Sequence, residues 1–110
     1  MPSAAEIFTQ MDERIKANAD KAKSDVNATY KFVLEGDGGG TYLVNMKDDL
    51  GAKEGDGAAD CTITVAAPDF LGMIDGSVNG QMLFMSGKLK VAGDMSLAMK
   101  LQQVFEAFGK

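Results

Sequence analysis

The sequence contains no histidine, and this absence restricts the chemistry open to it. Histidine is the commonest general base and the commonest transition-metal ligand, so catalysis and metal binding lose their most frequent side chain. A single cysteine, Cys61, excludes an intramolecular disulfide and fits a reducing compartment. No apolar run approaches the roughly 20 residues that cross a bilayer, and no secretory signal pattern opens the chain. We therefore expect a cytoplasmic protein without catalytic residues, metal or cofactor.

Basic residues are also scarce. Lysine and arginine number 11 against 16 acidic residues, giving a formal charge of −5. Phosphate binding needs clustered Lys and Arg, so this balance argues against a nucleic-acid partner. An apolar content of 45% and a charged content of 25% are typical of a globular chain. At 110 residues we expect one domain, residues 1–110, acting as a monomer.

Apolar periodicity separates helices at both ends from strands between them. Ser3 and Glu6 form a capping box, and apolar residues at helical spacing predict a helix to about residue 22, with a weakly apolar final part that frays or stands off the core. Alternating apolar and polar residues predict strands. The expected strands are 30–35, 42–46, 52–55 (at an edge), 60–65 and 88–91.

Three further helices are expected in the second half of the chain. Pro68 suits the first turn of one helix, which Gly76 ends. Asn79 is a good cap for a short second helix, and Asp94 for a final helix rich in apolar residues. Helices gathered on a sheet in this order predict an α+β domain.

Two polar motifs have alternative interpretations. The glycine-rich stretch 36–40 is similar in composition to a phosphate-binding loop, but a strand follows it where such loops need a helix. A hairpin turn is favoured. Asp48 and Asp49, with Asp56 and Asp60 nearby, suggest a calcium loop. The alternating oxygen ligands and closing glutamate of such loops are missing, which favours solvated turns.

Two reactive or charged side chains also have two interpretations. Cys61 is a candidate nucleophile, but it lies on the apolar face of a strand and has no histidine to activate it. A structural role is favoured. Lys88 and Lys90 flank an apolar strand and offer a contact for an anionic headgroup. The alternative, which we favour, is two lysines on a solvated face.

Flexible apolar residues are concentrated between Phe70 and Met99. Five of the eight methionines lie between Met73 and Met99. Methionine is unbranched and polarisable, so it suits a wall that must adapt to variable shapes. The pattern fits either an ordinary core or such an adaptable wall.

Several segments carry a family resemblance. They are residues 60–64 (DCTIT), 69–71 (DFL), 81–93 (QMLFMSGKLKVAG) and 97–101 (LAMKL). From about residue 30 to residue 101 the chain resembles the type-two sterol carrier protein domain. The resemblance implies a five-stranded, mostly antiparallel sheet covered on one side by helices, with an apolar tunnel between them. It also implies carriage of a fatty acid, fatty acyl-CoA or sterol, with no catalysis by the domain itself.

The partners implied are a long-chain lipid and at most transient contact with a membrane. Two alternatives to a free carrier are a substrate-presenting accessory of a separate lipid-metabolising enzyme and a structural interaction module with a filled core. The chain departs from the family at Gly80, where many members have proline, and at residues 108–110, which do not match the peroxisomal address of many members.

A set of lipid-binding residues follows from the resemblance and the apolar pattern. Gln81 is the candidate polar contact at the tunnel mouth, with a helix-surface amide as the alternative. The predicted set is Phe32, Ile63, Phe70, Ile74, Gln81, Met82, Phe84, Met85, Leu97, Met99, Leu101 and Phe105.

Overall fold

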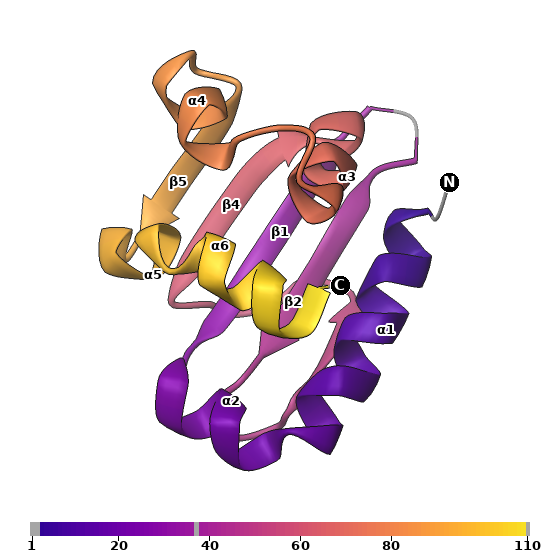
Figure 1. The fold of residues 1–110 in the computed structure, drawn as a ribbon, viewed down its shortest axis with the longest axis vertical. Coiled ribbons are helices and arrows are strands. Elements are labelled where there is room, and N and C mark those ends of the chain that lie inside the picture. Colours follow the sequence, from indigo (N-terminus) through magenta and orange to yellow (C-terminus); the bar gives the residue numbers. More distant parts are fainter. Residues whose placement is uncertain (1–2, 37, 110) are drawn as a thin grey trace.

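Five strands form one mixed sheet in the computed structural model, which describes residues 3–36 and 38–109. The strands are β1 (Thr29–Glu35), β2 (Gly40–Asn45), β3 (Gly51–Glu54), β4 (Cys61–Ala66) and β5 (Leu89–Gly93). Their order across the sheet is β3-β2-β1-β4-β5, as Figure 1 shows. Only the central β1–β4 pair is parallel; the three others are antiparallel. The predicted α+β fold and mostly antiparallel sheet are confirmed.

Helices cover one face of this sheet (Figure 1). They are α1 (Ala4–Ala17), α2 (Ala19–Asp25), α3 (Ala67–Asp75), α4 (Gly80–Met85), α5 (Met95–Met99) and α6 (Leu101–Val104), which continues as the π-helical turn η1 (Phe105–Gly109). The longest, α1, packs along the β3 edge. The two short helices α4 and α5 lie at opposite ends of β5, on the other edge.

The predicted helix caps are confirmed. The Oγ of Ser3 accepts a hydrogen bond from the Glu6 amide at 3.2 Å. The side chain of Asn79 accepts from the Gln81 amide at 2.8 Å, and that of Asp94 from the Ser96 amide at 2.9 Å. Each cap satisfies a first-turn N–H that has no partner inside its helix, which is why α1, α4 and α5 begin where the sequence predicts.

An aromatic cluster fills the core between α1, α3, η1 and the centre of the sheet. The side chain of Phe8 stacks on Tyr42 and on Phe70, with ring centroids 4.1 and 5.1 Å apart. The ring of Phe105 closes the cluster, 5.7 Å from Phe70. The residues that β1 contributes to this core occupy alternate positions of the strand, because side chains two residues apart point to the same face of the sheet. This half of the molecule is therefore densely packed.

The first helix is interrupted where the sequence predicts one helix with a fraying end. Asn18 leaves the helical conformation (φ −122°, ψ 45°), and its side-chain amide donates to the Arg14 carbonyl at 2.8 Å. A second helix, α2, begins at Ala19. Its buried residue, Ala22, holds it on the core, so the expectation that this part frays or stands off is wrong.

The last helix is also divided. Lys100 caps α5, and its amide is shared between the carbonyls of Ser96 (3.3 Å) and Leu97 (3.2 Å). Beyond this break, Leu101 and Phe105 are buried in the core. Before it, Met95 and Met99 are exposed. The break thus separates a core-packed segment from α5, which buries Leu97 and exposes its two methionines.

Candidate functional site

An apolar cavity of about 610 Å³ lies beside the β4–β5 end of the sheet, under the helices. Its floor comes from two strands: Ile63 on β4 faces it together with Leu89 and Val91 on β5. Val91 is the register partner of Ile63. Because alternate residues of a strand share a face, β5 necessarily turns both of its apolar residues the same way. Its apolar lining is Ile63, Met73, Val78, Phe84, Leu89, Val91, Met95, Ala98, Met99, Leu101 and Phe105.

Polar groups line the cavity at two places. Ser77, Asn79 and Gln81 come from the connection between α3 and α4 and from the first turn of α4, and Glu106 from η1. All four residues are exposed, so they form a solvent-facing edge of the cavity and not its interior. Asn79 is occupied as a helix cap. Among the described residues, the side-chain amide of Gln81 has no hydrogen-bond partner.

The cavity opens to solvent between α4 and α5. Phe84, Met95 and Met99 line it and are also substantially exposed, Met99 to 85%. Met82 and Met85 on α4 are exposed beside them. Large apolar side chains that both line a cavity and meet water mark its mouth.

The structure brings half of the predicted residue set to this cavity. Six line it: Ile63, Gln81, Phe84, Met99, Leu101 and Phe105. Four lie in the buried core outside its lining: Phe32, Phe70, Ile74 and Leu97. The remaining two, Met82 and Met85, are exposed beside its mouth. The part that each residue plays in lipid binding stays a prediction.

Several cavity residues were not in the predicted set. The apolar residues of β5, Leu89 and Val91, are the clearest, since the alternation that predicts the strand also places them on one face. The segment from Gly76 to Gly80 was missed because a loop carries no apolar period. Gly80, where the family often has proline, lies in this wall.

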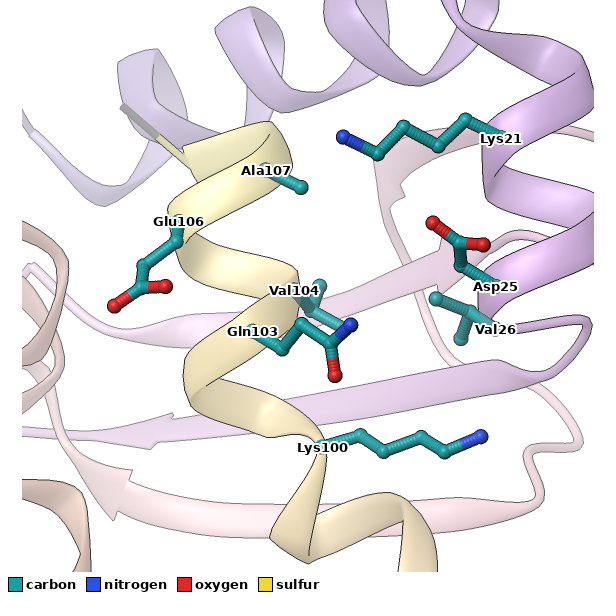
Figure 2. A pocket seen from close by; sticks show the side chains of 8 residues that line it. All are labelled: Lys21, Asp25, Val26, Lys100, Gln103, Val104, Glu106 and Ala107. Atoms are coloured by element: carbon teal, nitrogen blue, oxygen red, sulfur yellow. The ribbon is translucent and has the colours of Figure 1, made fainter.

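A second, smaller hollow of about 250 Å³ lies between α2 and the last helix (Figure 2). Lys21 and Asp25 face it from α2 and Lys100 from the other side, whereas the Glu106 side chain points away from α2 (Figure 2). Glu106 lines both hollows. With the ammonium groups of Lys21 and Lys100 and the carboxylate of Asp25 around it, this hollow suits polar groups or water better than a hydrocarbon chain.

The Cys61 thiol is buried on β4. Burial raises its pKa, and the negative charges of Asp94 and Asp60 raise it further. A thiol held in its neutral form is a poor nucleophile, which supports the structural interpretation of this residue.

The two turn motifs occupy the predicted places. In the predicted 36–40 turn, residue 37 lies outside the described residues; Gly36 and residues 38–39 stand between the antiparallel strands β1 and β2, with the Gly39 amide bonded to the Gly36 carbonyl at 3.1 Å, so a hairpin is confirmed. Asp56 accepts from the Lys31 ammonium at 3.0 Å, and Asp60 from the Thr29 amide at 3.0 Å. Lys31 lowers the pKa of Asp56. These aspartates therefore serve the local structure of the strand ends.

A mixed sheet with a largely apolar, solvent-open cavity beside the helices on one face is typical of a small α+β domain that binds apolar ligands. Comparison with known families agrees: the profile of the SCP-2 sterol transfer family matches residues 8–106. The chain belongs to this family and is a lipid-binding or lipid-transfer domain. Within residues 3–36 and 38–109, no helix is long and apolar enough to span a bilayer.

The chain is similar in sequence to known proteins and in fold to solved structures. Sterol carrier protein 2 of Rattus norvegicus is 37% identical over 103 residues, which cover 89% of this chain but 19% of the rat protein. Sterol carrier protein 2 of Yarrowia lipolytica, in its apo form, superposes with a TM-score of 0.85 at 24% identity, covering 96% of this chain and 92% of the other. Sterol carrier protein 2 of Aedes aegypti in complex with palmitate has a TM-score of 0.77 at 20% identity, covering 98% and 99%. The chain spans about a fifth of the rat relative and nearly the whole of both solved chains.

Proposed function

We propose that the 610 Å³ cavity carries the hydrocarbon part of a fatty acid or fatty acyl-CoA, with a sterol as the alternative cargo. The observation that carries this proposal is the lining: eleven apolar side chains from strands and helices converge on one hollow. Ligand pockets in proteins measure about 300–1,000 Å³ and are mostly apolar with a few polar groups. The palmitate complex of the similarly folded Aedes aegypti protein supports the choice of an acyl chain.

Burial of the chain supplies the affinity. Each methylene removed from water contributes about 0.8 kcal/mol, so a dozen contribute on the order of 10 kcal/mol before the costs of association. The exposed methionines at the mouth also contribute to the binding free energy, because a bound hydrocarbon chain covers their apolar surface. Flexible side chains close around chains of different length at little packing cost.

The polar edge of the cavity gives the headgroup a direction. The side-chain amide of Gln81 offers donors to a carboxylate or thioester oxygen, whereas the carboxylate of Glu106 repels an anion. The headgroup therefore lies near the α3–α4 connection. No side chain here pairs a nucleophile with a base, and we propose that the domain carries its cargo unchanged.

Two neighbouring residues of β5 test the cavity. Val91 faces it, whereas Ala92 is exposed on the opposite face of the same strand. Val91→Trp fills the hollow and should weaken binding of a fluorescent fatty acid at least about tenfold. Ala92→Trp adds the same ring at the same edge strand and should leave affinity unchanged. Displacement by palmitate, palmitoyl-CoA and cholesterol ranks the cargo classes.

If both variants bound the fluorescent fatty acid with the affinity of the parent, the cavity would not be its binding site. Native mass spectrometry of the purified parent, with retained lipid expected in the parent and lost in Val91→Trp, provides a second measurement. Failure of every lipid to bind or to be retained would favour the structural interaction module.

The second candidate function is presentation of substrate to a lipid-metabolising enzyme. It is favoured by the lengths of the relatives, since the matched region is 19% of the rat protein. Adding this domain to an acyl-CoA-using enzyme should lower the KM for acyl-CoA, and Val91→Trp should abolish that effect. An unchanged KM with the parent domain would contradict substrate presentation and leave lipid carriage as the single proposed function.

A further inference from the structure

The methionines of this chain fall into two groups by exposure. The sequence has eight, and residues 3–36 and 38–109 include seven of them. Three are buried: Met11, Met46 and Met73. Four are exposed, by 49% to 85%: Met82, Met85, Met95 and Met99. A dissolved oxidant can therefore reach the second group without any opening of the fold.

Two of the four exposed methionines belong to the cavity wall. Met95 and Met99, the first and last residues of α5, line the cavity, whereas Met82 and Met85 on α4 do not. Residues four apart lie on the same side of a helix, so Met95 and Met99 share one side of α5. These two side chains meet water and cavity together. Met73 also lines the cavity, but only 9% of it is exposed.

A peroxide converts a thioether to a sulfoxide in a balanced two-electron step. The sulfur lone pair attacks one oxygen of hydrogen peroxide, an S–O bond forms and the O–O bond breaks. The departing hydroxide takes up the proton of the transferred oxygen and leaves as water, so sulfur is oxidised and the peroxide is reduced. This step requires no general base, and access of the oxidant to the sulfur is its main condition.

The other oxidisable side chain does not compete for the oxidant. Cys61, the single cysteine of the sequence, is 0% exposed. Its oxidation requires the thiolate, and burial in the core favours the neutral thiol. A limited amount of peroxide therefore acts first on the exposed methionines.

We propose that Met95 and Met99 are an oxidation site of the cavity wall, and that conversion of their thioethers to sulfoxides by a peroxide lowers the affinity for hydrocarbon cargo. The effect on affinity rests on the proposed function; the preferential oxidation does not. A sulfoxide is polar where the thioether was apolar. A bound chain must then either desolvate the sulfoxide oxygen or give up the contact. Sulfoxides at Met82 and Met85, outside the lining, leave the wall unchanged.

The same geometry makes the site sensitive to cargo and reversible. A bound hydrocarbon chain covers Met95 and Met99, so the loaded protein should be oxidised there more slowly than the empty one. Methionine sulfoxide reductases return a sulfoxide to the thioether, with two electrons from a dithiol and loss of the oxygen as water. The cavity thus loses cargo under oxidation and regains it after reduction.

Peptide mass spectrometry of delipidated protein exposed to hydrogen peroxide tests the reactivity. The four exposed methionines should be oxidised several-fold faster than Met11 and Met46. Palmitate should slow oxidation of Met95 and Met99 and leave the rates at Met82 and Met85 unchanged. Oxidation of the two buried methionines at the rate of the exposed ones would overturn the proposal.

Binding of a fluorescent fatty acid, measured before and after a dose that leaves Met73 unoxidised, tests the effect on affinity. Oxidation should weaken binding at least about tenfold in the parent and in Met82→Leu with Met85→Leu. Met95→Leu with Met99→Leu keeps the apolar volume but removes both thioethers, and should keep its affinity after the same dose. Methionine sulfoxide reductases with dithiothreitol should restore binding by the oxidised parent.

The outcomes separate this proposal from the proposed function. If the unoxidised parent bound no fatty acid, the proposed function and the effect on affinity would fail together. If it bound normally and kept its affinity with Met95 and Met99 fully converted, the oxidation site alone would be overturned. An equal loss of affinity in the two leucine variants would overturn it as well, because the loss would then come from sulfoxides elsewhere.

Discussion

Tyr30 places a phenol hydroxyl inside the apolar core. This hydroxyl donates to the backbone carbonyl of Leu97 at 2.5 Å, and so ties the central strand β1 to α5. Burial raises the pKa of Tyr30, and electrostatic interaction with Asp94, and with Cys61 once that thiol ionises at alkaline pH, acts in the same direction. A neutral, hydrogen-bonded phenol is thus favoured strongly in the folded state.

This shift predicts a loss of stability at high pH. The folded pKa of Tyr30 lies above its unfolded value of about 10. Its stabilisation is therefore complete below pH of about 10 and is lost as pH rises toward the folded pKa, because the unfolded chain then binds fewer protons. Tyr30→Phe should remove part of this alkaline loss and should cost about 1 kcal/mol at neutral pH through the missing hydrogen bond.

Urea unfolding between neutral and strongly alkaline pH measures the effect. Burial and the charge of Glu54 also raise the pKa of Tyr42. The Tyr30→Phe variant should therefore still lose stability with rising pH, but with a smaller slope than the parent. An alkaline slope identical in Tyr30→Phe and the parent would show that Tyr30 does not couple folding to this titration.

Gly87 ends α4 in the left-handed region, with φ of +80°. Its amide bonds to the Phe84 carbonyl at 3.2 Å, and the next amide, that of Lys88, bonds to Leu83 at 2.8 Å. A Cβ here would meet nothing within 4 Å, so substitution is opposed by the backbone conformation and not by a clash. Gly87 is therefore required for its positive φ and not for a close approach of a neighbour.

Gly87→Val should therefore cost at least about 2 kcal/mol, since β-branched residues tolerate positive φ worst. Gly87→Ala should cost about half as much. We expect the valine variant to lose lipid binding and cooperative melting together, because α4 and β5 both depend on this turn. Gly80→Ala is the control, because Gly80 does not have a positive φ and an added Cβ would contact Met73 at an ordinary 3.4 Å. This variant should melt at the temperature of the parent or above it. A valine variant that melts and binds like the parent would make this junction an ordinary loop.

Element boundaries were predictable wherever a side chain sets them. Ser3, Asn79 and Asp94 cap helices locally, so sequence alone places the starts of those helices. The break at Lys100 was not predictable, because the residues on both sides of it favour helix. It depends on tertiary contacts, among them the Tyr30 hydrogen bond to Leu97.

For the candidate site, the sequence predicts which way a strand side chain points but not which residues it contacts. Alternation shows that Phe32 points inward but not what it meets there. It meets the rings of Phe8 and Phe70, at 5.6 and 5.7 Å, which belong to elements far apart in the sequence. For Ile63, one strand nearer the β5 edge, the same inward direction leads to the cavity.

One carboxylate links α1 to the edge strand β3 by a hydrogen bond, in addition to the packing of the two elements. Asp12 accepts a hydrogen bond from the Ala52 amide at 2.8 Å and pairs with Lys16 at 3.1 Å. Asp12→Ala leaves the Ala52 amide without its acceptor and should cost about 1–3 kcal/mol. Asp12→Asn keeps an oxygen acceptor and should recover most of this loss.

Hydrogen exchange at β3 measures this effect locally, with faster exchange at Ala52 in the alanine variant and protection close to the parent's in the asparagine variant. Unchanged exchange in Asp12→Ala would show that side-chain packing of α1 holds this edge without the carboxylate.

In the whole molecule, the β3 edge and the β5 edge of the sheet have different roles. Towards β3, helix α1 seals a dense aromatic core. Towards β5, short helices and flexible methionines surround a hollow open to water. The rigid side supplies stability, which leaves the other free to keep apolar surface exposed until a ligand covers it.

Ligand should therefore stabilise the entire domain. A molecule that binds only the folded state contributes about 2.7 kcal/mol at a hundredfold excess over its Kd. For a domain of about 100 residues this raises the Tm by about 10 °C or more. Palmitate or its CoA ester, titrated into delipidated protein and followed by thermal melting, should produce that rise. Val91→Trp, which fills the hollow in advance, should show a much smaller rise, and Ala92→Trp the full one. If saturating ligand left the Tm of the parent unchanged, the hollow would not be a binding site, because a filled cavity that couples to folding must shift the melting transition.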